Sequence, residues 1–218
     1  MLRVLLTGFA PFGGSLVNPS GRAVAALAEA SPLPGIALAT AVLPVTYAGA
    51  LPALRAALAA HAPDVVLATG LAGGRAPVSV ERVAVNIDDA RVPDNDGVQR
   101  IDAPVVPDGP AAYFASIPIK TITAAIRDAG VPAEVSQSAG TFLCNHVFYH
   151  ACHLAAIERP GLRAGFIHLP WLPEQAVRHP AAPSMALDDV LRALRATLAV
   201  LRDTAAGADL RVAEGAVS

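Results

Sequence analysis

Three side chains that could together catalyse acyl transfer lie far apart in the sequence: Glu81, Cys144 and His168. Cys144 follows a β-like run and a glycine-containing turn, and helix-forming residues come after it, so we expect it in the first turn of a helix. A helix N-terminus carries about half a positive charge, which favours the reactive thiolate. The sequence therefore indicates a nucleophile, although Cys144 could instead be a small buried core residue, as many cysteines are.

The other two residues supply the groups that such a nucleophile needs. His168 ends an apolar run over 162–169 that predicts a strand, which is where an α/β enzyme often carries a base; the alternative is a hydrogen-bonded core histidine. Glu81 lies in an alternating segment over 77–87, where a charged side chain usually faces solvent. In a Cys–His–Glu triad the imidazole would take the thiol proton or hold it as an ion pair, and the carboxylate would orient the imidazole.

The elements that position these residues alternate between strand and helix. Such alternation predicts the α/β class: a single-domain, three-layer α/β/α fold over 1–218 with a mostly parallel twisted central sheet, and a candidate frayed tail over about 206–218. The expected strands and helices cover residues 3–7, 18–30, 36–45, 47–60 (with a kink or restart at Pro52), 64–69, 77–87, 121–129, 133–135, 162–169 and 188–202.

Two loops follow predicted strands, over 8–18 and 70–75, at the sheet edge where ligands of parallel sheets bind. Phe9 and Phe12 in the first loop could wall a pocket for a small apolar ring, or fold back as a plug over the core. Neither loop carries a phosphate-binding glycine motif. Residues 88–110 are irregular and rich in Asp and Pro, which is typical of a lid or binding loop.

Composition limits the class of protein. Of 218 residues, 54% are hydrophobic and 16% are charged, which excludes a disordered chain, and the net charge of −2 without a basic stripe indicates no nucleic-acid partner. Apolar runs are too short to cross a bilayer and the first residues do not resemble a signal peptide, so we expect no membrane association and a cytoplasmic location. Cys144 and Cys152, two helical turns apart, are too distant for a disulfide, which suits a reducing compartment.

A metal site is the alternative from another class. His146 and His150 are spaced to share one helix face, and Cys144, Cys152 and His153 are close in sequence. Against zinc, no H-E-x-x-H motif is present and the three histidines do not share one narrow face.

Five motifs in order resemble the pyroglutamyl peptidase I (pyrrolidone-carboxylate peptidase) family over nearly the whole chain, to about residue 174. The motifs are Leu5-Leu6-Thr7-Gly8-Phe9 with Asn18-Pro19-Ser20, Glu81-Arg82-Val83-Ala84-Val85-Asn86, Pro93-Asp94-Asn95-Asp96-Gly97, Ser138-Ala139-Gly140-Thr141 with Cys144-Asn145-His146, and Gly165-Phe166-Ile167-His168 before Pro170.

The resemblance implies a cysteine exopeptidase that releases an N-terminal pyroglutamyl residue from peptides through a thioester, using a single α/β/α domain, no cofactor and often a homotetramer. It implies that Cys144 is the nucleophile, His168 the base and Glu81 the orienting acid. The substrate-binding residues would be Phe9, Phe12 and Phe142 around the lactam ring and Asn18 as a polar contact.

Two further positions concern substrate binding. Arg91, in the long loop after the Glu81 strand, could add positive charge near the oxyanion. Leu71 stands where the family pattern usually carries glutamine, so a hydrogen bond to the bound substrate would be lost, at roughly 1 to 3 kcal/mol for each buried group left unpaired. This departure keeps open a homologue that binds pyroglutamyl ends without cutting, or one with altered specificity.

Overall fold

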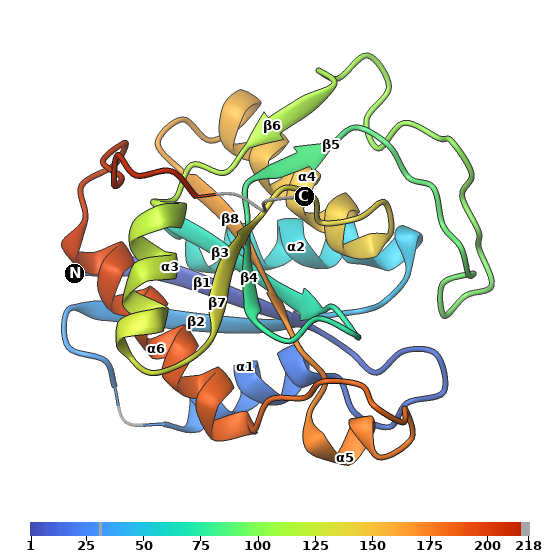
Figure 1. The fold of residues 1–218 in the computed structure, drawn as a ribbon. Helices are drawn as coiled ribbons and strands as arrows, with labels where there is room; N and C mark the ends of the chain where they lie inside the picture. The colour runs from blue at the N-terminus through green and yellow to red at the C-terminus, as the bar shows by residue number, and fades with distance from the viewer. Residues whose placement is uncertain (31, 215–218) are drawn as a thin grey trace.

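A six-stranded sheet runs through the middle of the molecule in the order β2-β1-β3-β8-β4-β7 (Figure 1). The structure, a computed structural model, describes residues 1–30 and 32–214. β1, β2, β3 and β8 are parallel, β4 runs antiparallel to β8, and β7 is parallel to β4, so the predicted mostly parallel sheet is confirmed. The strands are β1 (Leu2–Phe9), β2 (Ile36–Leu43), β3 (Val65–Leu71), β4 (Val78–Glu81), β7 (Ala133–Ser136) and β8 (Arg163–Leu169).

Helices cover both faces of this sheet and complete the three layers that the sequence predicted (Figure 1). Alternate residues of each buried strand point to opposite faces, so the sheet contributes side chains to two separate hydrophobic clusters. One cluster lies under α1 (Pro19–Glu29), α3 (Ile119–Asp128) and α6 (Leu187–Asp203). The other lies under α2 (Tyr47–His61) and α4 (Leu143–Ile157). A short helix, α5 (Pro173–Ala176), follows β8.

Local sequence signals explain the helix starts. Asn18 is the N-cap of α1, with its side chain accepting from the Ser20 N–H, and Pro19 occupies the first turn as predicted. Thr46 is the N-cap of α2, and its side chain accepts a hydrogen bond from the Gly49 N–H. α2 runs unbroken from Tyr47 to His61 in spite of Pro52, so the helix does not restart there.

The segment predicted as one strand over 77–87 is two strands in different sheets. β4 ends at Glu81, and after Arg82 the chain continues as β5 (Val83–Val85), which pairs antiparallel with β6 (Ala112–Phe114) in a second, two-stranded sheet. The chain passes from one sheet to the other at Arg82. The Arg82 N–H donates to the Ser136 carbonyl at the end of β7, and the Arg82 carbonyl accepts from the Ala115 N–H just after β6.

The last described residues contact α3, in the stretch over about 206–218 where the sequence indicated a candidate frayed tail. Pro118, at the N-cap of α3, has no side-chain oxygen, and the Asp209 carboxylate takes that role by accepting from the N–H groups of Lys120 (3.1 Å) and Thr121 (2.9 Å). Glu214 forms an ion pair with Arg127 at 2.6 Å. Residues 215–218 of the expected tail lie outside the described residues.

Within the described ranges, none of the helices has both the length and the apolar character needed to cross a membrane.

Candidate active site

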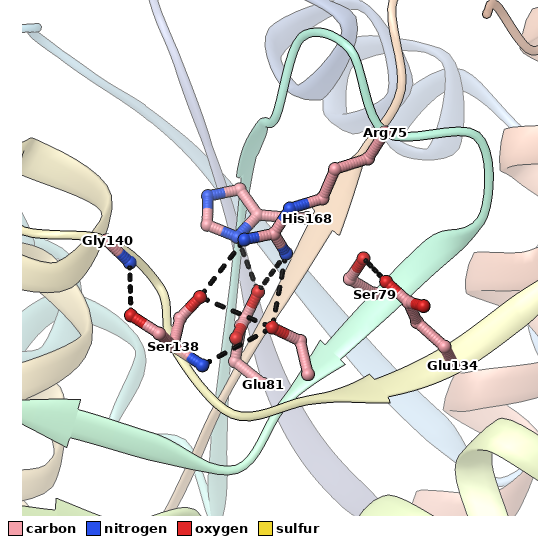
Figure 2. Close-up of polar contacts among 8 residues, drawn as sticks. Arg75, Ser79, Glu81, Glu134, Ser138, Gly140 and His168 are labelled. Carbon is pink, nitrogen blue, oxygen red and sulfur yellow. Dashed lines mark hydrogen bonds and ion pairs between the residues drawn. The ribbon is translucent and has the colours of Figure 1, made fainter. Parts of the chain in front are cut away.

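A buried imidazole–carboxylate pair joins two central strands. His168, near the end of β8, and Glu81, at the end of β4, are 4% and 0% exposed. His168 Nδ1 lies 2.8 Å from Glu81 Oε1 (Figure 2). An ionised carboxylate can only accept hydrogen bonds, so Nδ1 carries the proton and Nε2 is left as a basic nitrogen. The pair has the form of a base with its orienting acid.

Glu81 is buried although a charged residue in mid-strand usually faces solvent. Val78 and Val80 of β4 pack in the cluster under α1, α3 and α6, so the alternate residue Glu81 points to the opposite face of the sheet, which α2 and α4 cover. Arg75, which the sequence analysis did not single out, compensates the charge: its Nη1 donates to Glu81 Oε1 at 2.8 Å (Figure 2). In the described part of the chain, Glu81 Oε2 is buried with no hydrogen-bond partner.

Cys144 is the second residue of α4, as expected for the first turn of a helix. Its sulfur lies over β3, because a Cβ atom added to Gly70 would come within 2.7 Å of it. Gly70 is in register with His168 on the adjacent strand β8. Two residues earlier on these strands, Ala68 and Phe166 point to the α4 face. Gly70 and His168 therefore share that face, and the sulfur lies over β3, the strand next to the one that carries the imidazole; the backbones of neighbouring strands are about 4.8 Å apart.

The electrostatics favour a neutral thiol and a neutral imidazole at rest. Burial raises the pKa of the Cys144 thiol to about 12, with Glu81 raising it further and Arg75 lowering it. Burial lowers the pKa of His168; Glu81 opposes that shift, and Arg75 adds to it. Of the two roles open to the imidazole, this favours a base that accepts the proton during attack over a preformed ion pair.

An aromatic cavity of about 230 Å³ opens beside Cys144. Five of the six residues predicted to bind substrate line it: Phe9, Phe12, Asn18, Leu71 and Phe142. The rings of Phe12 and Phe142 pack with centroids 5.3 Å apart, so the loop after β1 and the start of α4 form one wall. Its size suits a small ligand.

Two polar side chains of this cavity, those of Asn18 and Ser15, are already engaged. Asn18 Oδ1 accepts from the Ser20 N–H at 3.1 Å, and its Nδ2 donates to the Ala10 carbonyl at 3.0 Å. Ser15 Oγ donates to the Val17 carbonyl at 2.8 Å. Both residues therefore hold the loop after β1 in shape.

Arg91 is exposed in the loop between Asp88 and Pro110, and it is outside the set of described residues that line the cavity. Two other residues of that loop form hydrogen bonds with segments next to the cavity. Asp94 Oδ2 accepts from the Tyr47 N–H at 2.8 Å, and Asn95 Nδ2 donates to the Pro11 carbonyl at 3.0 Å. The irregular loop is therefore tied to the start of α2 and to the loop that carries Phe12.

Trp171 is a second site residue that the sequence analysis missed. It lies two residues after β8, lines the cavity, and stacks on His179 with ring centroids 4.1 Å apart. The sequence signal was present, because the single tryptophan of the chain follows closely after the strand that carries His168.

The metal hypothesis lacks a cluster to support it in the described ranges, where no three His, Cys, Asp or Glu side chains are placed to hold an ion. His146 Nδ1 lies 2.9 Å from Asp88 Oδ2, and His153 Nδ1 lies 2.9 Å from the Tyr113 hydroxyl. These imidazoles therefore have protein partners of their own.

Known proteins are similar to this chain over nearly their full length. A family model described as Pyroglutamyl peptidase matches residues 2–204. A pyrrolidone-carboxylate peptidase from Streptomyces coelicolor is 56% identical over 216 residues, 99% of either chain. One from Chromobacterium violaceum is 56% identical over 195 residues, 89% of this chain and 90% of its own. The solved structure of Bacillus amyloliquefaciens pyroglutamyl peptidase I matches with a TM-score of 0.90 and 42% identity, covering 94% of this chain and 98% of that one.

Proposed function

The chain belongs to the pyroglutamyl peptidase family, and from that premise we propose that it is a cysteine exopeptidase that releases N-terminal pyroglutamyl residues from peptides. The observation that carries the proposal is the His168–Glu81 pair, 2.8 Å apart, on the sheet face over which the Cys144 sulfur lies beside an aromatic cavity. Peptidase relatives support the reaction class, and this geometry supports a thiol as the nucleophile.

In the proposed first step the pyroglutamyl ring occupies the cavity and its exocyclic carbonyl lies over Cys144. His168 Nε2 takes the thiol proton as the sulfur attacks the carbonyl carbon, and Glu81 stabilises the imidazolium. The oxyanion would accept from backbone N–H groups at the start of α4, which are free for it because the N-cap residue, Phe142, has no side-chain acceptor.

The intermediate then collapses. The C–N bond breaks, the imidazolium gives its proton to the departing amine, and the peptide leaves one residue shorter. A thioester joins the pyroglutamyl group to Cys144. His168 next takes a proton from water, which attacks the thioester carbonyl, and the returning proton restores the thiol as free pyroglutamate leaves.

Recognition of the ring would rest on shape and on backbone hydrogen bonds. Pyroglutamate is a flat neutral ring with one N–H donor and one carbonyl acceptor, and the walls formed by Phe9, Phe12 and Phe142 match its apolar faces. Leu71 cannot pair with either polar group. This observation favours the second candidate, a homologue that binds the pyroglutamyl end without cutting it or that prefers a related ring.

Turnover of a pyroglutamyl aminocoumarin amide, followed by fluorescence, tests the proposal. We expect release by the wild type and no release from the matching alanyl amide, which lacks the ring. Cys144→Ser should abolish release, while the matched control Cys152→Ser, which changes the same atom on the same helix, should retain it. Release that survives Cys144→Ser would contradict the nucleophile, and binding without release by the wild type would select the second candidate.

A homotetramer and a cytoplasmic location stay predictions. Light scattering of the purified protein and fractionation of its host cells would check them.

A further inference from the structure

The guanidinium of Arg75 contacts Glu81 itself and the turn that leads to Cys144, and so it reaches two of the three proposed catalytic groups or the segment that carries them. Arg75 lies in the loop between β3 and β4. Its Nη1 donates to Glu81 Oε1 at 2.8 Å and to Ser136 Oγ at 3.2 Å, and its Nη2 donates to the Ser138 carbonyl at 3.1 Å (Figure 2). One planar group therefore links the end of β4, the end of β7 and the turn that leads into α4.

Glu81 Oε1 is a shared acceptor. Both Arg75 Nη1 and His168 Nδ1 lie 2.8 Å from it. The Glu81 side chain is fully buried, whereas that of Arg75 is 33% exposed. A buried carboxylate without a counter-charge would take up a proton, or would draw one onto its imidazole neighbour, and either change would remove the free base.

The same guanidinium holds the turn before the nucleophile. Ser136 Oγ donates to the Ser138 carbonyl at 3.2 Å, and Ser138 Oγ accepts from the Gly140 N–H at 3.1 Å. Arg75 contacts two members of this small network, and the N-cap of α4 follows two residues after Gly140. The direction from which α4 presents Cys144 is thereby coupled to the position of Glu81.

We propose that Arg75 is a positioning residue of the Cys144–His168–Glu81 site: it holds the Glu81 carboxylate aimed at His168 Nδ1, and it fixes the turn that leads to Cys144. The inference rests on the proposed function. Arg75 acts through Glu81 and the turn, and it does not line the cavity within the described residues.

The charges around His168 give the sign of the pH effect. Glu81 on β4 raises the pKa of His168, Arg75 lowers it, and Glu134 on β7 is engaged with Ser79 at 2.9 Å. Removing Arg75 takes away a cation that opposes proton uptake. The Glu81–His168 pair should then gain its proton at higher pH, and the acidic limb of kcat/KM should move to higher pH.

Three variants test this inference: Arg75→Gln, Arg75→Lys and the control Arg55→Gln. Arg55 forms an ion pair with Glu158 on the surface through two hydrogen bonds, at 2.7 and 2.6 Å. We expect Arg75→Gln to lower kcat about 10- to 100-fold, with KM changed less than about threefold, and to shift the acidic limb upward. Arg75→Lys should restore part of kcat and should return the acidic limb part of the way to its wild-type pH. Arg55→Gln should match the wild type.

A fall in thermal stability alone, with kcat and the acidic limb of Arg75→Gln unchanged, would overturn the inference. If the wild type itself fails to release pyroglutamate, the proposed function fails separately. The titration of the Glu81–His168 pair, followed through the His168 ring by NMR, then still decides the role of Arg75: it should move to higher pH in Arg75→Gln and stay in place if Arg75 has no influence on the pair.

Discussion

The first and third turns of α4 each carry a cysteine, in contrasting surroundings. Cys144 is partly exposed at an aromatic cavity, and the charges of Glu81 and Arg75 act on it. Cys152 is 5% exposed inside the hydrophobic cluster under α2 and α4, where burial alone acts on its thiol. Burial nevertheless raises the pKa of each thiol to about 12.

The pKa of both thiols is raised, so the proposed reactivity of Cys144 does not rest on a thiol that is ionised in advance. Both residues lie in the same helix, so what distinguishes Cys144 is its neighbourhood: a cavity that could hold substrate, and an imidazole held by a carboxylate. The proposed advantage of Cys144 arises when the substrate is attacked, because only then does the imidazole need to accept a proton.

The largest test of this contrast removes the carboxylate charge. Glu81→Gln should lower kcat about 10³- to 10⁴-fold, because an amide no longer stabilises the imidazolium or selects the correct tautomer. Glu134→Gln is the matched control, since this strand carboxylate bonds to Ser79 instead of His168, and it should stay within about threefold of the wild type. Steady-state kinetics measure both, with circular dichroism to verify folding; equal turnover in Glu81→Gln would remove that residue from the mechanism.

Alkylation compares the two thiols directly. Iodoacetamide should modify Cys144 at least about 100 times faster than Cys152 in the native protein, because only Cys144 opens to a cavity. With a thiol pKa of about 12, the thiolate fraction and the Cys144 rate should rise about tenfold per pH unit from 7 to 9. Peptide mass spectrometry gives both rates. A rate that is already constant at pH 7 would reveal a preformed ion pair, and equal labelling of the two residues would end the contrast.

A substitution at Leu71 tests whether the ring of the substrate binds in the cavity. Leu71→Gln adds a hydrogen-bonding group beside the proposed ring site, and one net bond of about 0.5 to 1.5 kcal/mol would lower KM about two- to tenfold with kcat little changed. Leu71→Met, apolar and of similar volume, should leave KM near the wild-type value. An unchanged KM in both variants would mean that the ring does not contact this side chain.

The smallest effect is expected at the other cysteine. Cys152→Ala should keep turnover within about twofold, while the lost sulfur contacts lower the free energy of unfolding by about 1 kcal/mol. Urea denaturation measures the stability. A large loss of activity in a folded Cys152→Ala protein would show that the third turn takes part in the chemistry after all.

Much of the scaffold was predictable because its signals are local. Apolar runs identified the strands that end at Phe9 and Leu71, and Asn18-Pro19 announced the start of α1. The position of Cys144 in the first turn of α4 followed from the glycine turn before it. These features depend on neighbours within a few residues, which the linear sequence displays.

The parts that were not predicted depend on distant contacts. Glu81 is buried because its side chain points to a helix-covered face of the sheet, beside His168, and Arg75 cannot be told from an ordinary loop cation until the fold brings it to that carboxylate. β5 could not be separated from β4 without its partner β6, which is three residues long and begins 27 positions after β5 ends, at Ala112. Asp209 likewise gains a role only through its contact with α3.

Gly70 on β3 shows that a residue without a functional group can be essential to the shape of such a site. Gly70 has no acidic, basic or nucleophilic group, yet one methyl group placed there would overlap the Cys144 sulfur and the Phe166 ring, at 2.7 and 2.9 Å. The sulfur of the proposed nucleophile occupies space that is open because Gly70 has no side chain. A search that considers only reactive side chains would overlook Gly70, a glycine that leaves room for the proposed reaction.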